Sequence, residues 1–250
     1  MPAETSMPAK TAKSRRTLAE RLAALDWEAV ERSLWERGHA RTTPVLRADE
    51  CRALAALYGD DARFRKRVVM ERHRYGLGEY KYFASPLPGL VGELREHAYA
   101  PLAAVANRWM EALRLDERYP ATLAAFLERC ADQGQSQPTP LMLSYEEGGY
   151  NCLHQDLYGE VAFPFQIVVQ LDRAGTDYTG GEFLLVEQRP RAQSIGEAIA
   201  AARGELVIFT TRIRPVAGSR GYYRVNVRHG VSRLHSGKRR ALGVIFHDAR

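Results

Sequence analysis

Residues 222–246 read YYRVNVRHGVSRLHSGKRRALGVIF. They contain two runs rich in β-branched, aromatic and apolar side chains, at 222–229 and 239–246, joined by a polar segment that includes Gly237. Short runs of this kind, bounded by glycine and polar residues, are typical of antiparallel strands. The stretch therefore predicts a strand, a turn and a second strand.

Four earlier runs have the same texture and are separated by glycine, proline or aspartate: 140–146, 161–171, 181–188 and 205–210. Regularly spaced short strands favour a sandwich or jelly roll. Residues 136–250 are therefore predicted to form a double-stranded β-helix, interrupted by one helix at about 192–203.

The first half of the chain has a different, helical periodicity. Helices are expected from Thr17 onward, at 48–58, at 88–114 as one helix or as two broken near Pro101, and at 121–132 after Pro120. The expected fold class is α+β. The expected layout is a basic disordered tail at 1–16, then one domain at 17–250 with helical support at 17–135 and the jelly roll at 136–250.

Composition bounds the kind of protein. The 250 residues are 45% hydrophobic and 26% charged, and the formal net charge is +6. A chain of this size buries a core without disulfides or a structural metal, so a metal site would be functional. Three scattered cysteines without CxxC spacing, and no apolar leader or membrane-length run, predict a cytoplasmic protein without membrane contact.

The segment His154-Gln155-Asp156 is the first chemical signal. Residues i and i+2 of a strand project to the same face, so an imidazole and a carboxylate would point at one spot. His229, at the end of the 222–229 run, is the expected third ligand. Two histidines and one carboxylate are the ligand set of non-haem Fe(II) oxygenases, and the remaining positions accept a bidentate 2-oxo acid and dioxygen.

Arg239 follows His229 by ten positions, on the next predicted strand. A guanidinium can clamp a carboxylate through two hydrogen bonds, as the distal end of 2-oxoglutarate requires. Each assignment has an alternative. His235 could replace His229 as a metal ligand, although it is expected in a solvent-facing loop. Arg240 could replace Arg239 as the residue that binds the carboxylate. Arg239 and Arg240 are neighbours on one strand, so only one of them can face the interior.

Residues 140–246 resemble the catalytic core of the Fe(II)/2-oxoglutarate dioxygenase superfamily. The run from His229 to Arg239, with Gly180-Gly181-Glu182 before a strand, is similar to prolyl-hydroxylase-type members. His154-Gln155-Asp156, with Tyr145 nine positions upstream, is similar to AlkB-type nucleic-acid demethylases, although the plus-ten arginine departs from their longer spacing. This resemblance implies that Tyr145 contacts 2-oxoglutarate, with core packing as its alternative role, and that ascorbate serves as a further cofactor.

Several longer strings resemble a bacterial family of proposed oxygenases acting on damaged DNA. They are Arg74-Tyr-Gly-Leu-Gly-Glu-Tyr-Lys-Tyr-Phe83, Pro138-Thr-Pro, Tyr150-Asn-Cys-Leu-His-Gln-Asp156 and Phe246-His-Asp248. The implied activity is hydroxylation coupled to conversion of 2-oxoglutarate to succinate, with oxidative demethylation of alkylated nucleic acid as the expected reaction.

Two segments bear on the substrate. Residues 63–83 hold seven Lys or Arg, two acids and five aromatics, and residues 206–247 hold nine Lys or Arg and no acid. Cations interleaved with aromatics suit single-stranded nucleic acid, but a solvated basic face is an equal reading. The 74–83 string could form a lid or a tight hairpin. A protein or peptide hydroxylase and a non-catalytic jelly-roll binding module are the alternatives.

Within the metal segment, three neighbours have ambiguous roles. Tyr150 and Asn151 could line the site or form a turn after Gly148-Gly149. Cys152 shares the face of His154, and a packed core position is the expected role for its thiol.

Overall fold

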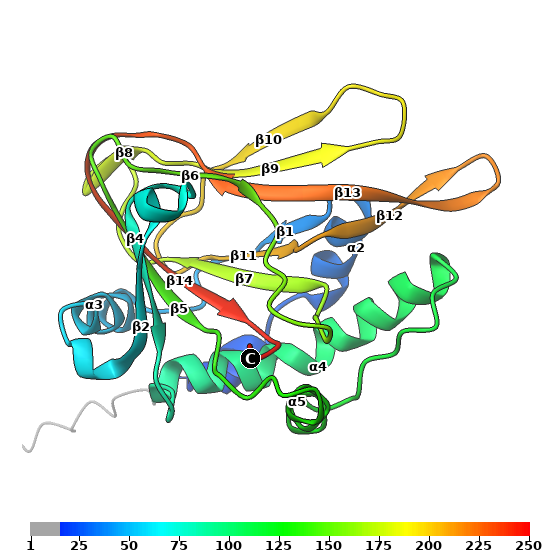
Figure 1. Ribbon diagram of the computed structural model, residues 1–250, viewed down its shortest axis with the longest axis horizontal. Coiled ribbons are helices and arrows are strands. Elements are labelled where there is room, and N and C mark those ends of the chain that lie inside the picture. Colours follow the sequence, from blue (N-terminus) through cyan, green and yellow to red (C-terminus); the bar gives the residue numbers. More distant parts are fainter. Residues whose placement is uncertain (1–15) are drawn as a thin grey trace, which may run out of the picture.

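The computed structural model describes residues 16–250. The expected tail at 1–16 lies outside these residues, except for Arg16. Two facing β-sheets form the upper and middle parts of the molecule, and helices cover the outer face of one sheet (Figure 1). This is the predicted jelly roll with helices packed against it.

The helices lie mostly in the first half of the chain. Their bounds are α1 Leu18–Ala23, α2 Trp27–Arg37, α3 Ala48–Leu57, η1 Asp61–Arg63, η2 Met70–His73, α4 Gly89–Ala112 and α5 Leu123–Asp132. Side chains at the helix starts accept hydrogen bonds from backbone N–H groups, as Thr17 does in α1 and Asp26 does in α2. Such caps satisfy donors that the first helical turn leaves free.

The strands form two sheets. In the larger sheet the order is β1 (His39–Arg41), β11 (Leu206–Thr210), β7 (Phe165–Gln170), β14 (Leu234–Ile245), β5 (Leu141–Glu146), β4 (Glu79–Phe83) and β2 (Phe64–Val69), with β8 (Tyr178–Gly180) paired to β14. In the smaller sheet the order is β10 (Ile195–Ile199), β9 (Phe183–Gln188), β13 (Gly221–Val231), β6 (Tyr150–His154) and β3 (Gly76–Leu77), with β12 (Ile213–Gly218) paired to β13. All of these strand pairings are antiparallel.

The main hydrophobic core lies between the helices and the larger sheet. Its largest fully buried side chain is Trp109 of α4, whose ring packs 4.7 Å from that of Phe165 in β7. A smaller core around Phe183, Phe209 and Val227 joins the two sheets near β9, β11 and β13. Side chains from both sheets therefore pack against each other in this region.

Two expectations about secondary structure are wrong. Residues 192–203 contain the strand β10 in place of a helix, because this segment pairs along its length with β9, from Ile195 opposite Glu187 to Ile199 opposite Phe183. Pairing with a neighbouring strand outweighs the helical propensity of its alanines and glutamate. The first half is also less helical than expected, since β1 to β4 lie within 17–135 and β2 and β4 extend the larger sheet.

Pro101 does not break α4, which runs continuously through it. A proline removes one hydrogen bond from the helix interior and normally disfavours helix. Here the neighbouring side chains Ala98, Tyr99 and Leu102 are fully buried against the sheet. Their packing outweighs the lost hydrogen bond.

The 74–83 string is a hairpin arm. The backbone N–H of Met70 donates to the carbonyl of Gly78 over 2.9 Å, β2 pairs with β4, and β3 pairs with β6. Within residues 16–250, no helix is both long enough and apolar enough to cross a membrane.

Candidate metal centre and its pocket

His154 and His229 lie directly opposite each other on the paired strands β6 and β13. Their ring centroids are 4.2 Å apart. Antiparallel pairing brings side chains on one face of neighbouring strands into contact, so residues 75 positions apart in the chain meet here (229 − 154).

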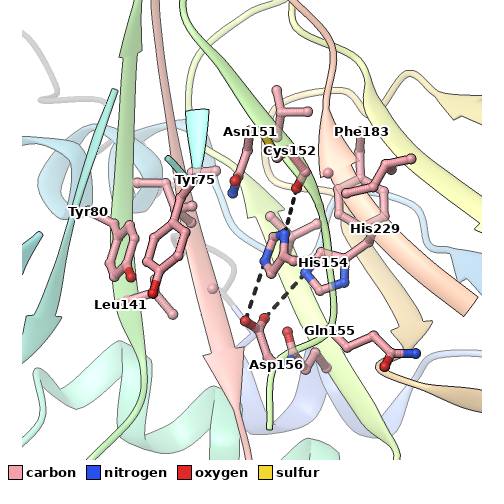
Figure 2. A pocket seen from close by; sticks show the side chains of 18 of the residues that line it. Tyr75, Tyr80, Leu141, Asn151, Cys152, His154, Gln155, Asp156, Phe183 and His229 are labelled. Atoms are coloured by element: carbon pink, nitrogen blue, oxygen red, sulfur yellow. Dashed lines mark hydrogen bonds and ion pairs between the residues drawn. The ribbon is translucent and has the colours of Figure 1, made fainter. Parts of the chain in front are cut away.

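Asp156 completes the cluster from the loop just after β6. Its Oδ1 lies 3.3 Å from Nε2 of His154, and its Oδ2 lies 3.3 Å from Nε2 of His229 (Figure 2). One ligand atom from each of the three residues lies within 4.8 Å of the others. This spacing of two imidazole nitrogens and one carboxylate oxygen can accommodate a metal ion.

A backbone contact orients one imidazole. Nδ1 of His154 lies 2.8 Å from the carbonyl oxygen of Cys152 and can donate a proton there, so Nε2 is the ring nitrogen directed at Asp156. Second contacts of this kind fix the tautomer of metal-binding histidines. The ring of His229 is held differently, between Phe209 at 4.7 Å and Phe183 at 5.8 Å between centroids.

The electrostatics of the cluster favour an ionised carboxylate. Burial raises the pKa of Asp156, but hydrogen bonds and charge from His154 and His229 outweigh it and hold this pKa well below its usual range. Burial lowers the pKa of His229, and the neighbouring His154 lowers it further. This favours a neutral His229 imidazole beside an ionised carboxylate, which is the protonation state that metal ligands need. Burial also lowers the pKa of His154, but the hydrogen bond and charge of Asp156 outweigh it and raise this pKa.

Two residues that the sequence did not single out support Asp156. The Tyr158 hydroxyl donates a 2.8 Å hydrogen bond to Oδ1 of Asp156. The Gln155 amide donates to the carbonyls of Val227 over 2.8 Å and Arg212 over 3.1 Å, which ties the loop after β6 to the neighbouring hairpin. Tyr158 stands two positions after Asp156, but its role depends on a loop conformation that has no sequence periodicity.

Arg239 faces the same cavity from β14. Its side chain is 3% exposed, its Nε has no hydrogen-bond partner, and it is absent from the ion pairs formed among residues 16–250. The Tyr178 side chain hydrogen-bonds with Arg239, and the charge of Glu182 interacts with it, but no carboxylate among residues 16–250 forms an ion pair with this guanidinium. A buried guanidinium in this state is stabilised when an anion binds to it. The site therefore fits an anionic ligand with a carboxylate at this end.

Tyr145 is the cross-strand partner of Arg239 on β5, and the guanidinium carbon lies 5.6 Å from the centre of its ring. Its hydroxyl accepts a 3.4 Å contact from the amide of Asn151, and its side chain is fully buried while lining the cavity. Both the co-substrate role and the packing role expected for Tyr145 are compatible with this position.

The rival residues point elsewhere. Arg240 forms an ion pair with Asp172 at 2.7 Å, away from the cavity. His235 is exposed as expected, but it lies in strand β14 and not in a loop, because β14 begins at Leu234 and pairs with β8. Cys152 is exposed and lines the cavity, so its expected place in the core is wrong.

The cavity measures about 530 Å³ and lies between the two sheets. The three clustered residues and Arg239 share it with mainly apolar and aromatic side chains, among them Leu143, Ile167, Phe209 and Val231. Among residues 16–250, Asp156 is the only carboxylate that lines it. Ligand sites of this kind combine an apolar wall with a few convergent polar groups.

Comparisons with known proteins agree with this geometry. Residues 78–249 match the model of the Oxygenase-NA family, described as an oxygenase catalysing oxidative methylation of damaged DNA. Two uncharacterized proteins of Mycobacterium tuberculosis, from strains CDC 1551 and H37Rv, are each 46% identical over 190 residues, which cover 74% of this chain and 82% of theirs.

The chain is also similar to solved structures. A Pseudomonas putida prolyl-4-hydroxylase is 19% identical, with 90% of this chain and 99% of that chain covered and a TM-score of 0.52. A non-haem α-ketoglutarate-dependent epimerase from nogalamycin biosynthesis is 13% identical, with 88% and 81% covered and a TM-score of 0.53. At these identities the likeness is one of fold.

Proposed function

This chain belongs to the Oxygenase-NA family of oxygenases, and we propose that it is an Fe(II)- and 2-oxoglutarate-dependent dioxygenase that oxidatively demethylates alkylated nucleic acid. One observation carries the proposal. His154, Asp156 and His229 gather three ligand atoms on one side of the cavity, and the buried Arg239 faces the same cavity without forming an ion pair among residues 16–250.

In this proposal the three clustered residues hold the iron, and Arg239 and Tyr145 hold the distal carboxylate of 2-oxoglutarate. Bound iron and 2-oxoglutarate supply the activation of dioxygen, with succinate and carbon dioxide as products and ascorbate as an accessory reductant. The chain's own residues orient and shield: Cys152 fixes the His154 ring, Tyr158 holds Asp156, and the apolar walls exclude water.

The substrate assignment rests on the family's damaged-DNA description and on the basic character of the chain. Hydroxylation of an N-methyl carbon gives a hemiaminal, which breaks its C–N bond and releases formaldehyde. An oxygenase acting on a methylated base therefore removes the methyl group. The three cysteines are free, which suits the reducing, cytoplasmic setting that we propose for this reaction.

A turnover assay tests the proposal. The protein is purified without oxygen, supplied with Fe(II) and 2-oxoglutarate, and exposed to air, and succinate is quantified. We expect succinate from the wild type, and none above background from His154→Ala or Arg239→Ala. His235→Ala is the matched control for the first variant and should behave as wild type, because His235 lies outside the cavity.

The substrate is tested in the same assay. A methylated oligonucleotide should increase succinate formation, and the formaldehyde released should equal this increase. The alternative activity is peptide hydroxylation, which the ten-residue spacing from His229 to Arg239 favours. If a peptide increases succinate formation and gains the mass of one oxygen atom, peptide hydroxylation replaces demethylation as the proposed activity. If the wild type neither binds iron nor forms succinate, the proposed oxygenase is refuted, and a non-catalytic binding module is the remaining candidate function.

A further inference from the structure

We propose that Tyr75 and Arg74 form the substrate-holding edge of this pocket: the Tyr75 ring stacks on an unpaired nucleobase, and Arg74 contacts a neighbouring phosphate. This inference rests on the proposed function, because it names the residues of the same pocket that recognise the substrate. Both residues line the cavity and both are exposed to solvent.

The Tyr75 ring is unusually placed for a large aromatic side chain. It is 49% exposed while it lines a cavity that also contains the metal cluster. Figure 2 shows Tyr75 and Tyr80 on one side of the pocket and the metal cluster on the other. The His73 ring lies nearly parallel to that of Tyr75, at 5.3 Å and 23°, so the phenol already takes part in a stack.

The backbone of Tyr75 is anchored to the strand that carries a metal ligand. The N–H of Tyr75 donates to Met70 over 3.0 Å, and its carbonyl accepts from the N–H of Cys152 over 2.8 Å. Cys152 is in β6, the strand that ends at His154. Gly76 packs so closely on β6 that an added Cβ would lie 2.3 Å from the Tyr150 carbonyl oxygen. The Cα of Tyr75 is therefore held next to the strand of His154, and a base stacked on its ring would lie at the same end of the cavity as the metal cluster.

The charge of the edge suits a polyanion. Arg74 adopts a left-handed backbone conformation with φ 60°, which ends η2 and directs the chain into the pocket rim. Its side chain is exposed and lines the cavity. Of the carboxylates in the described part of the chain, only Asp156 lines the cavity, so no further carboxylate of the lining would repel a phosphate near Arg74.

An aromatic platform beside a cation fits a nucleotide better than a peptide. Bases stack on aromatic side chains irrespective of sequence, and each phosphate adds a cation contact. An enzyme that acts on a base needs that base outside the helical stack. The expected ligand is therefore single-stranded nucleic acid, with one base against Tyr75 and its methyl group directed at the metal cluster.

Binding, without turnover, tests the inference. A fluorescent single-stranded oligonucleotide is titrated with the full-length protein in the absence of oxygen, and a second oligonucleotide carries 2-aminopurine, whose emission falls on stacking. We expect Tyr75→Ala to weaken binding about tenfold and to abolish the quenching. Tyr75→Phe should retain both. Arg74→Gln should make the dependence of log K on log salt shallower by about 0.7.

Two matched controls separate recognition from general surface effects. Tyr222 is 50% exposed on β13 and lies outside the cavity, so Tyr222→Ala should bind as wild type. Arg32→Gln, at an exposed position of α2, should leave the salt dependence unchanged. Equal losses of oligonucleotide affinity in the Tyr75 and Tyr222 variants, or no loss of affinity in Tyr75→Ala, would overturn the inference.

Because the titration needs neither iron nor oxygen, its result is independent of the oxygenase assay. Wild-type succinate formation with unaltered binding by Tyr75→Ala would refute the recognition edge and leave the proposed oxygenase in place. If oligonucleotide binding depends on Tyr75 but the wild type forms no succinate, the recognition edge is supported and the proposed oxygenase is refuted.

Discussion

The hydroxyl of Tyr158 donates a 2.8 Å hydrogen bond to Oδ1 of Asp156, the carboxylate that lies between His154 and His229. We therefore expect Tyr158→Phe to weaken metal binding about tenfold or more, because partners of metal ligands orient them and raise their affinity. Calorimetric titration with Mn(II) measures the effect. Tyr119→Phe, another buried tyrosine outside the cavity, is the control. Equal affinities of wild type and Tyr158→Phe would contradict this role.

Metal binding should also stabilise the folded protein. A ligand that binds only the native state adds about 2.7 kcal/mol at a concentration 100 times its Kd. We expect Mn(II) to raise the Tm of the wild type and EDTA to reverse the shift. His154→Ala should show no shift. His235→Ala should keep the full shift, and its loss there would argue that His235, not His229, is the ligand.

Arg239→Gln should raise the KM for 2-oxoglutarate about 100-fold, because charge-assisted hydrogen bonds to a carboxylate contribute about 1.5–3 kcal/mol. Its affinity for Mn(II) should stay near that of the wild type, since Arg239 is not among the clustered ligands. Arg240→Lys is the matched control because Arg240 pairs with Asp172 outside the cavity. A lost metal site in Arg239→Gln would show that the arginine supports the fold instead.

Glu50 should make stability depend on pH. Burial raises the pKa of its carboxyl, but hydrogen bonds from the Arg21 side chain and the Arg47 backbone, with the charges of both arginines, bring this pKa below its usual value. A lowered native pKa adds stability that is complete above the unfolded pKa, about 4.3, and is lost as pH falls through the native pKa.

Glu50→Gln should therefore reduce the free energy of unfolding by about 2 kcal/mol at pH 7, and by less below pH 4, in urea titrations. Glu117→Gln removes a more exposed ion pair with Arg129 and should cost less than about 1 kcal/mol at either pH. A loss at Glu50 that does not change with pH would point to packing and not to charge.

The sequence predicted the strands β5, β7, β9, β11, β13 and β14 and a cluster of two histidines and one carboxylate, because those features depend on short runs of β-branched and aromatic residues and on residue chemistry. The structure brings His154, Asp156 and His229 together, and it separates Arg239 from Arg240 by strand alternation. What the sequence could not show depends on tertiary contacts. Tyr158 meets Asp156 through an irregular loop, and 195–199 becomes a strand only because β9 lies beside it.

The pairing of β6 with β13 places His154 and His229 in register. A growing or partly folded chain that contains His154 and Asp156 but not β13 has an incomplete ligand set. We therefore expect the metal affinity to be a property of the closed sheet and not of any local segment. Metal capture during refolding would report the moment when these two distant strands meet.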